Sequence, residues 1–172
     1  GHSEGGRSVG YLAKISMCRV IVVDDDDASL GEYIELISGL CYECIGVNNV
    51  RSALDVLRDN DTIGIVVTDL RTPGIDGFTF LEEISERYSN KRPIVPIVIS
   101  GFISLENTVR VMRSGAIDFI EKPICVNDLA ASLRRASLRL AQLAYKRSAK
   151  SGFLEFYEDD AATDHTSTKE TD

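Results

Sequence analysis

Short apolar runs alternate along the chain with stretches in which apolar residues recur every three or four positions. The runs are rich in valine and isoleucine, which favour β-strands, and the longer spacing is typical of amphipathic helices. This alternation predicts βαβ units and therefore an α/β fold with a doubly wound parallel sheet. Five strands are expected, at residues 19–23, 42–47 and 63–68, in a run that ends at residue 99, and at 116–120.

Particular residues indicate where the intervening helices begin and end. Asp27 is a suitable N-cap for the first helix, and Gly39 is expected to end it. Gly115 is expected to end the fourth helix. Pro96 cannot donate a ladder hydrogen bond, so it weakly favours a late start for the fourth strand. The second, third and fourth helices are expected at 50–59, from about 78 onward, and at 105–113.

The last helix is expected from about Asn127 to about Lys146. Its apolar residues follow a heptad-like spacing of four and three. The repeat covers too few heptads to establish a coiled coil. The first half of this helix can pack on the sheet. The second half extends past the domain and must either find a partner, such as a second copy in a homodimer, or fray. The apolar residues are Leu129, Leu133, Ala136, Leu140 and Leu143.

These patterns divide the chain of 172 residues into one domain with extensions. Residues 1–17 are expected to form a flexible leader and residues 18–138 the domain. A helical extension is expected at 139–150, followed by a polar, acidic and disordered tail at 151–172.

The charge and hydropathy of the chain narrow its function. A formal net charge of -8 argues against direct nucleic-acid binding by this segment, because phosphate contacts need clustered lysine and arginine. No apolar run approaches the roughly 20 residues of a membrane span, and no secretory leader is evident. We therefore expect a cytoplasmic protein without a membrane partner.

Reactive side chains follow four of the expected strands. The carboxyl ends of parallel strands meet at one edge of a sheet, which is where such sheets bind ligands. Carboxylate oxygens suit Mg²⁺, and a carboxylate can also attack phosphorus. A metal ion and an ammonium group would then neutralise the phosphoryl oxygens, so the pattern indicates phosphoryl chemistry. The side chains in question are Asp24, Asp25, Asp69, Ser100 and Lys122.

Four segments in this order resemble the receiver domain of two-component response regulators. They read VIVVDDD, VVTDLRTPGIDG, PIVPIVISG and GAIDFIEKP, and the resemblance extends over about residues 19–138. It is closest to receivers of nitrogen-regulation or nodulation regulators. The resemblance implies a flavodoxin-like sheet in the order 2-1-3-4-5.

The resemblance also implies a role for each residue of the site. Asp69 would accept the phosphoryl group, and Ser100 and Lys122 would hold its oxygens. Phe119 would be the aromatic residue that switches together with Ser100. The Mg²⁺ ligands would be the side chains of Asp24, Asp25 and Asp69 and the backbone carbonyl of Arg71.

The implied protein is a signalling phosphoacceptor that assists its own phosphorylation and dephosphorylation, and not an enzyme in the usual sense. Its partners would be a histidine kinase or phosphotransfer protein, and an output domain or downstream protein that regulates transcription. The surface formed by the fourth helix, fifth strand and fifth helix would change on phosphorylation. The chain would be either a stand-alone regulator or a fragment of a longer one. Arg71 and Phe102 flank the site and are expected to affect the access of water.

Two other functions remain open from the sequence. A haloacid-dehalogenase-like phosphohydrolase would use Asp24 as nucleophile and Asp26 as acid and base, with Ser100 and Lys122 in support. It would leave the segment from Asp69 to Gly77 unexplained. The second alternative is an interaction module that has kept the fold but is not phosphorylated. The intact set of acidic, hydroxyl and ammonium groups argues against it.

Overall fold

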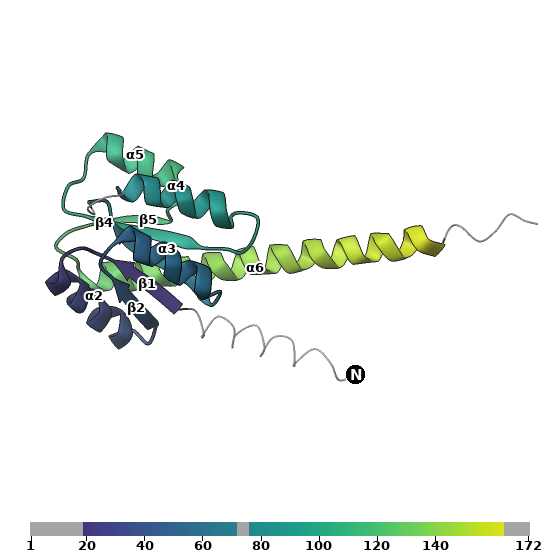
Figure 1. The fold of residues 1–172 in the computed structure, drawn as a ribbon, viewed down its shortest axis with the longest axis horizontal. Coiled ribbons are helices and arrows are strands. Elements are labelled where there is room, and N and C mark those ends of the chain that lie inside the picture. Colours follow the sequence, from purple (N-terminus) through teal and green to yellow (C-terminus); the bar gives the residue numbers. More distant parts are fainter. Residues whose placement is uncertain (1–18, 72–75, 164–172) are drawn as a thin grey trace, which may run out of the picture.

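The computed structural model describes residues 19–71 and 76–163, and side chains as far as Ser151. The predicted leader at 1–17, the loop at 72–75 and the end of the predicted tail at 164–172 lie outside these residues. The described chain forms a three-layer α/β domain from which one long helix projects (Figure 1). Its strands are β1 Arg19–Val23, β2 Glu43–Val47, β3 Ile63–Asp69, β4 Val95–Ser100 and β5 Asp118–Glu121. Its helices are α2 Asp27–Gly39, α3 Val50–Asp59, α4 Gly77–Tyr88, α5 Leu105–Arg113 and α6 Val126–Thr163.

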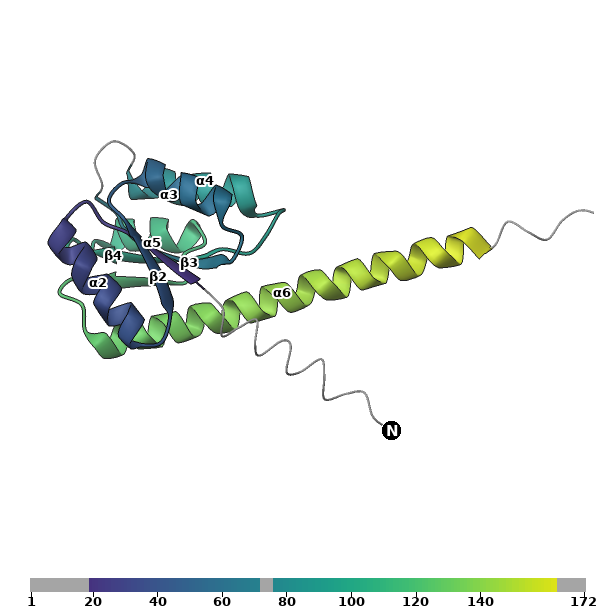
Figure 2. The same cartoon turned by 60° about the horizontal axis from the view of Figure 1, so that its bottom comes forward.

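The five strands are all parallel and lie in the order β2-β1-β3-β4-β5, which confirms the predicted topology. β3 is the central strand and is buried along its whole length, as its continuous apolar sequence predicts. Helices α2 and α6 cover one face of the sheet, and α3, α4 and α5 cover the other (Figures 1 and 2). The carboxyl ends of all five strands therefore meet at one edge.

Each face of the sheet has its own hydrophobic core. Under α2 and α6, Val20, Ile65 and Ile97 of the sheet pack with Ile37 and Leu133 of the helices. On the opposite face, side chains of β1 and β3 pack against α3 and α4, and a smaller cluster lies under α5. Because strand side chains alternate between faces, neighbouring residues of β1 and β3 belong to different cores. The two cores fix the register of the central strands.

The first helix ends where it was predicted to end, but its N-cap is a different residue. Asp26, and not Asp27, is its N-cap, and the Asp26 side chain accepts a hydrogen bond of 3.3 Å from the backbone N–H of Ala28. Gly39 is the last helical residue as expected, but the left-handed conformation after the helix is taken by Cys41, with φ of 67°. The run of four aspartates offers several equivalent caps, so the sequence alone does not single out Asp26.

Pro96 lies inside β4, and not before it as its chemistry weakly suggested. Its carbonyl accepts a hydrogen bond of 2.8 Å from the N–H of Ile117, on the side where β5 runs. In a parallel strand the N–H and C=O of one residue point to the same neighbour, so the missing Pro96 donor faces the segment just before β5 starts. The ladder on that side begins one residue later, at Ile97. β5 itself starts at Asp118, two residues after the predicted start.

Helix α6 continues well past Lys146, where it was expected to end, and reaches Thr163. It therefore includes the predicted extension at 139–150, and it replaces the predicted disorder over residues 151–163 with helix. The segment after residue 146 contains no proline and a single glycine, Gly152, so nothing in it stops a helix that packing has already nucleated. Among the helices of the described ranges, α6 included, none is both long and apolar enough to cross a bilayer.

Shortening a buried leucine of α6 should destabilise the domain much more than shortening an exposed one. Leu133 is fully buried and Leu138 is 60% exposed on the same helix. Leu133→Ala is expected to lower the free energy of unfolding by about 2–5 kcal/mol, whereas Leu138→Ala should change it by less than about 0.5 kcal/mol. Urea unfolding followed by circular dichroism measures both. Equal losses for the two variants would contradict the packing of α6 on the sheet.

Candidate functional site

The parallel topology brings four of the predicted side chains to one edge of the sheet. Asp24 directly follows β1, Asp69 and Ser100 end β3 and β4, and Lys122 directly follows β5. The register places Asp69 opposite Ile99, one residue before Ser100. The backbone N–H of Lys122 donates a hydrogen bond of 2.9 Å to the carbonyl of Ser100 and so joins the ends of β5 and β4. The peptide bond that follows, Lys122–Pro123, is cis.

At the centre of the site, one ammonium group contacts two buried carboxylates. Lys122 Nζ lies 2.5 Å from Asp69 Oδ2 and 3.4 Å from Asp24 Oδ2. Asp24 is 1% exposed and Asp69 is 8% exposed, so little water screens these contacts. Burial, the largest influence, lowers the pKa of Lys122, but the hydrogen bond and charge of Asp69 outweigh it and raise this pKa above its usual value. The lysine is therefore charged at every physiological pH.

The remaining oxygen of each carboxylate is held by the backbone. The N–H of Asp26 donates to Asp24 Oδ1 at 2.9 Å, and the N–H of Arg71 donates to Asp69 Oδ1 at 2.9 Å. Each carboxylate thus has one oxygen on a backbone N–H and the other on the Lys122 ammonium. This double attachment fixes both carboxylates so that they face the same point.

Burial controls the protonation of Asp24. It raises the pKa of the Asp24 carboxyl above its usual value, although the N–H of Asp26 and the charge of Lys122 act in the opposite direction. Ionised Asp24 is therefore maintained against a desolvation penalty. Placing a carboxylate where it is costly is typical of sites that bind cations or react.

The Ser100 hydroxyl is buried and bonded within its own loop. Its Oγ lies 3.1 Å from the carbonyl oxygen of Phe102 and 3.2 Å from the Phe102 backbone nitrogen. Ser100 thus lies at the predicted edge of the sheet, and its hydroxyl is directed to the loop that leads into α5.

The other predicted site residues lie at the border of this centre. Asp25 is exposed, next to the buried Asp24. Arg71 is also exposed, and its guanidinium lies 5.4 Å from the centre of the Phe102 ring, so the two predicted flanking residues contact each other. Phe119 is half-buried and packs against the small cluster under α5. The structure therefore brings Asp24, Asp69 and Lys122 into direct contact, with the others around them.

The donor set suits a divalent cation of the hard, oxygen-binding kind. Two buried carboxylates, Asp24 and Asp69, converge on one cationic group, and Mg²⁺ is usually held by one or two carboxylates with water and phosphate. Within the described ranges no group of three or more histidine, cysteine, aspartate or glutamate side chains forms a ready-made metal cluster. The two buried carboxylates, Asp24 and Asp69, both contact the Lys122 ammonium. The third acidic side chain, Asp25, is exposed to solvent.

Tyr33 also borders the site, and the sequence analysis did not identify it. It is 6% exposed on α2, and Lys122 Nζ lies 6.0 Å from the centre of its ring. Burial raises the pKa of its hydroxyl. Its position four residues before the buried Ile37 places both on one helix face, which is the signal that could have identified Tyr33 as inward-facing.

Comparison with known proteins places the chain in a family. Residues 20–134 match the family described as the response regulator receiver domain, so the chain belongs to that family. The two-component response regulator PprB of Pseudomonas aeruginosa is 28% identical over 121 residues, which cover 70% of this chain and 44% of PprB. The C4-dicarboxylate transport transcriptional regulatory protein DctD of the same species is 33% identical over 116 residues, which cover 67% of this chain and 24% of DctD.

A solved structure supports the fold. A response regulator receiver domain from Clostridium thermocellum superposes with a TM-score of 0.66 at 24% identity, covering 71% of this chain and 95% of that one. The chain spans less than half the length of the curated relatives PprB and DctD, which therefore contain further regions.

Neutralising Asp24 should stabilise the domain near pH 7. Because its folded pKa is raised, the stability that this group contributes is present at low pH and is lost as pH rises through the folded pKa. Asp24→Asn removes that loss, so its melting temperature should exceed that of the wild type near pH 7. The difference should shrink as pH falls through the raised folded pKa of Asp24, because the wild-type carboxyl then becomes protonated in the folded state.

Asp25→Asn is the matched control, because Asp25 is exposed and its replacement should leave the melting temperature nearly unchanged. Thermal unfolding followed by circular dichroism without added metal measures all three proteins. A melting temperature for Asp24→Asn below that of the wild type near pH 7 would contradict this account of the site.

Proposed function

We propose that this receiver domain takes a phosphoryl group from a histidine kinase or phosphotransfer protein onto Asp69 and works as a Mg²⁺-dependent switch. The observation that carries the proposal is the contact of one ammonium, on Lys122, with the buried carboxylates of Asp69 and Asp24. A carboxylate that is to attack phosphorus must lie where the negative charge of the incoming group is already compensated.

The transfer is a single displacement. An oxygen of Asp69 forms the new O–P bond while the N–P bond of a phosphohistidine on the partner breaks. The leaving imidazole nitrogen keeps that electron pair and takes a proton from solvent. Lys122, already 2.5 Å from Asp69, stays beside the transferred group and binds one of its oxygens. A Mg²⁺ ion held by Asp24, Asp25, Asp69 and the backbone carbonyl of Arg71 would supply further positive charge there.

Ser100 and Phe119 connect this event to the surface. When the Ser100 hydroxyl leaves the carbonyl of Phe102 and binds a phosphoryl oxygen, the loop from Phe102 into α5 loses an anchor. Phe119, half-buried beside that helix, then turns inward into the space that is freed. The phosphoryl group interacts more favourably with the arrangement in which Ser100 binds it and Phe119 is turned inward. Phosphorylation therefore shifts the equilibrium toward that arrangement.

The surface that changes is formed by α5, β5 and α6. Helix α5 buries a single residue, Val111, so few contacts hold it in place. It presents Leu105, Val109 and Met112, which are 82%, 40% and 49% exposed and recur at helical spacing. Such an exposed apolar stripe is suited to a partner. We propose that an output domain or downstream protein reads it and, as the name of DctD suggests, that the outcome is regulation of transcription.

A network at β5 and α6 supports this surface from one side. The Ser132 hydroxyl and the Arg135 guanidinium both donate to the Asp118 carboxylate. Burial, the largest influence, raises the pKa of Asp118, but these bonds outweigh it and lower the pKa below its usual value. The network keeps α6 fixed while α5 moves.

The phosphohydrolase alternative assigns acid and base catalysis to Asp26. Asp26 is exposed and caps α2, where its carboxylate accepts bonds from the backbone N–H of Ala28 and the hydroxyl of Ser29. Those bonds lower its pKa, the bond from Ser29 most strongly. A carboxylate with a lowered pKa is a poor general acid near pH 7, so this geometry favours the phosphoacceptor.

Asp69→Ala should abolish phosphorylation by a small phosphodonor. With acetyl phosphate and Mg²⁺, the wild type should gain one phosphoryl group in intact-mass spectrometry, and Asp69→Ala should gain none because the attacking oxygen is absent. Asp59→Ala, which removes an exposed carboxylate at the end of α3, should be labelled like the wild type. Undiminished labelling of Asp69→Ala would rule out the proposed acceptor, and multiple turnover of phosphate monoesters by that variant would favour the phosphohydrolase.

Removing the Phe102 ring should shorten the life of the phosphorylated state. The Arg71 guanidinium and the Phe102 ring contact each other beside the mouth of the site, and together they restrict the approach of water to a phosphorylated Asp69. Phe102→Ala should lose its phosphoryl group several-fold faster than the wild type. Leu105→Ala, an apolar truncation at a more exposed position three residues on, should lose it at the wild-type rate. Decay is followed by phosphate-affinity electrophoresis after the donor is removed, and an unchanged rate in Phe102→Ala would contradict this role.

A further inference from the structure

The outer part of α6 lacks support from its own domain. Leu129, Leu133 and Ala136 are fully buried, and Leu140 and Leu143 still pack against the core, but Tyr145 is already 67% exposed. Beyond this point the helix projects away from the sheet (Figures 1 and 2). Most of the stability of a helix in a protein comes from the tertiary packing of its apolar face. A surface to pack on would therefore add to the stability of the projecting part.

The charges of α6 are separated along its length. From Arg134 to Lys150 every charged residue is basic, and from Glu155 to Asp160 every charged residue is acidic. The last turn carries no basic residue, so the acidic end coincides with the negative end of the helix dipole. This arrangement is unfavourable within one helix and would be relieved by positive charge from another molecule.

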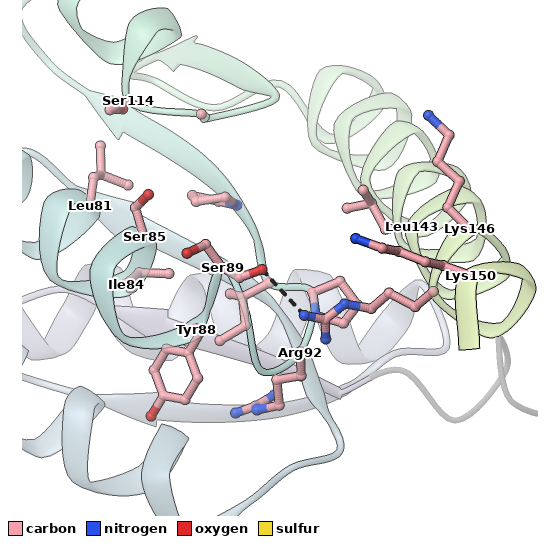
Figure 3. Close-up of a pocket in the computed structure, with 15 residues that line it drawn as sticks. Leu81, Ile84, Ser85, Tyr88, Ser89, Arg92, Ser114, Leu143, Lys146 and Lys150 are labelled. Atoms are coloured by element: carbon pink, nitrogen blue, oxygen red, sulfur yellow. Dashed lines mark hydrogen bonds between the residues drawn. The ribbon is translucent and has the colours of Figure 1, made fainter. Parts of the chain in front are cut away.

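A cleft with a basic rim lies where α6 leaves the domain. It has a volume of about 320 Å³ and lies between the end of α4, the loop after it and α6 (Figure 3). Leu81, Ile84 and Leu143 form part of its apolar lining, and Lys146, Arg147 and Lys150 of α6 form its basic side. One guanidinium nitrogen of Arg147 donates to the carbonyl of Ser89 at 3.2 Å and ties α6 to the loop after α4. Lys146 and Lys150 are exposed.

We propose that this cleft receives residues 153–160 of a second copy of the chain, so that two α6 helices pair in antiparallel orientation. That segment reads FLEFYEDD, with four large apolar and four acidic residues, which matches an apolar cleft with a basic rim. The pairing deepens the expectation of a homodimer through this helix by fixing its orientation and its docking surface. It does not depend on phosphorylation.

The numbering of the helix agrees with this arrangement. If two antiparallel helices cross at Gly152, residue 154 of one lies opposite 150 of the other, and 157 lies opposite 147. The acidic, aromatic segment of each copy then runs beside residues 144–151 of its partner, which include the basic residues Lys146, Arg147 and Lys150 on the α6 side of the cleft. The heptad-like spacing continues through residues 147, 150, 154 and 157. In the antiparallel pair each of these residues therefore lies opposite another residue of the same series. Gly152, without a Cβ, permits close approach at the crossing.

A parallel pairing would have the opposite electrostatics. Basic residues would lie beside basic residues and acidic beside acidic along the whole of the projecting segment. Like charges in register destabilise such a pair, and high salt would relieve the repulsion. Antiparallel pairing has two identical attractive contacts related by a two-fold axis, and salt weakens them.

Charge reversal and its rescue test the proposal in the unphosphorylated chain. Sedimentation equilibrium of residues 1–172 should show a monomer–dimer equilibrium that weakens as NaCl is raised. Lys146→Glu and Glu158→Lys should each raise the dimer dissociation constant about tenfold, because two symmetry-related attractions become repulsions. The double variant should return the constant to near the wild-type value. Arg51→Glu, the same charge change on the exposed surface of α3, should have no such effect.

The outcomes separate this proposal from the proposed function. Asp69→Ala should dimerise like the wild type, so a failure of phosphorylation leaves the dimer test intact, and the reverse also holds. A monomer throughout the accessible concentration range would overturn the proposal. So would a dimer that strengthens with salt, since that is the behaviour of a parallel pair, or a double variant without rescue. Circular dichroism of each variant confirms that the domain is folded.

Discussion

The site depends on the placement of the Lys122 ammonium against the buried carboxylates of Asp24 and Asp69. Two like charges about 4 Å apart at an effective dielectric of about 20 repel each other by about 4 kcal/mol, so two carboxylates cannot share a buried edge without a compensating cation. The ammonium supplies that charge, and the N–H groups of Asp26 and Arg71 hold the remaining oxygens. The arrangement requires β1, β3 and β5 to end at one edge, and it is therefore a consequence of the parallel topology. In the proposed function, the charge that stabilises the resting site is also the charge that an incoming phosphoryl group would need.

The same edge connects chemistry to the surface through short paths. Ser100 lies at the end of β4, and its hydroxyl bonds to the loop that leads to α5, a helix with one buried residue. Asp118, by contrast, is bound by two side chains of α6. One flank of the surface is thus weakly held and the other firmly held. That difference in anchoring explains in physical terms why a local change at Asp69 would move α5 before it moves α6.

Much of this structure could be predicted because its determinants are local. The bounds of α3 and α5 matched the sequence prediction, since Asn49 and Ser104 cap them and the apolar spacing is clear. The four strand-end residues of the site were found because strand ends are read from apolar runs. Other features depend on neighbours that are distant in sequence and could not be predicted in this way. They are the position of Tyr33 near Lys122, the tolerance of Pro96 within β4, and the burial of Asp24 beside an exposed Asp25. The extent of α6 was underestimated because its polar composition suggested disorder, whereas the structure continues the helix to Thr163.

The central claim is that one site at the carboxyl edge of the sheet holds Asp24, Asp69 and Lys122 ready to bind a phosphoryl group. The most direct test is amide chemical-shift mapping by nuclear magnetic resonance, with Mg²⁺ and beryllofluoride as a stable phosphoryl mimic. The account predicts the largest shifts at residues 24, 69, 71, 100–102 and 122, a second group along α5, and loss of both in Asp69→Ala. Shifts confined to another part of the molecule, or unchanged by Asp69→Ala, would contradict it.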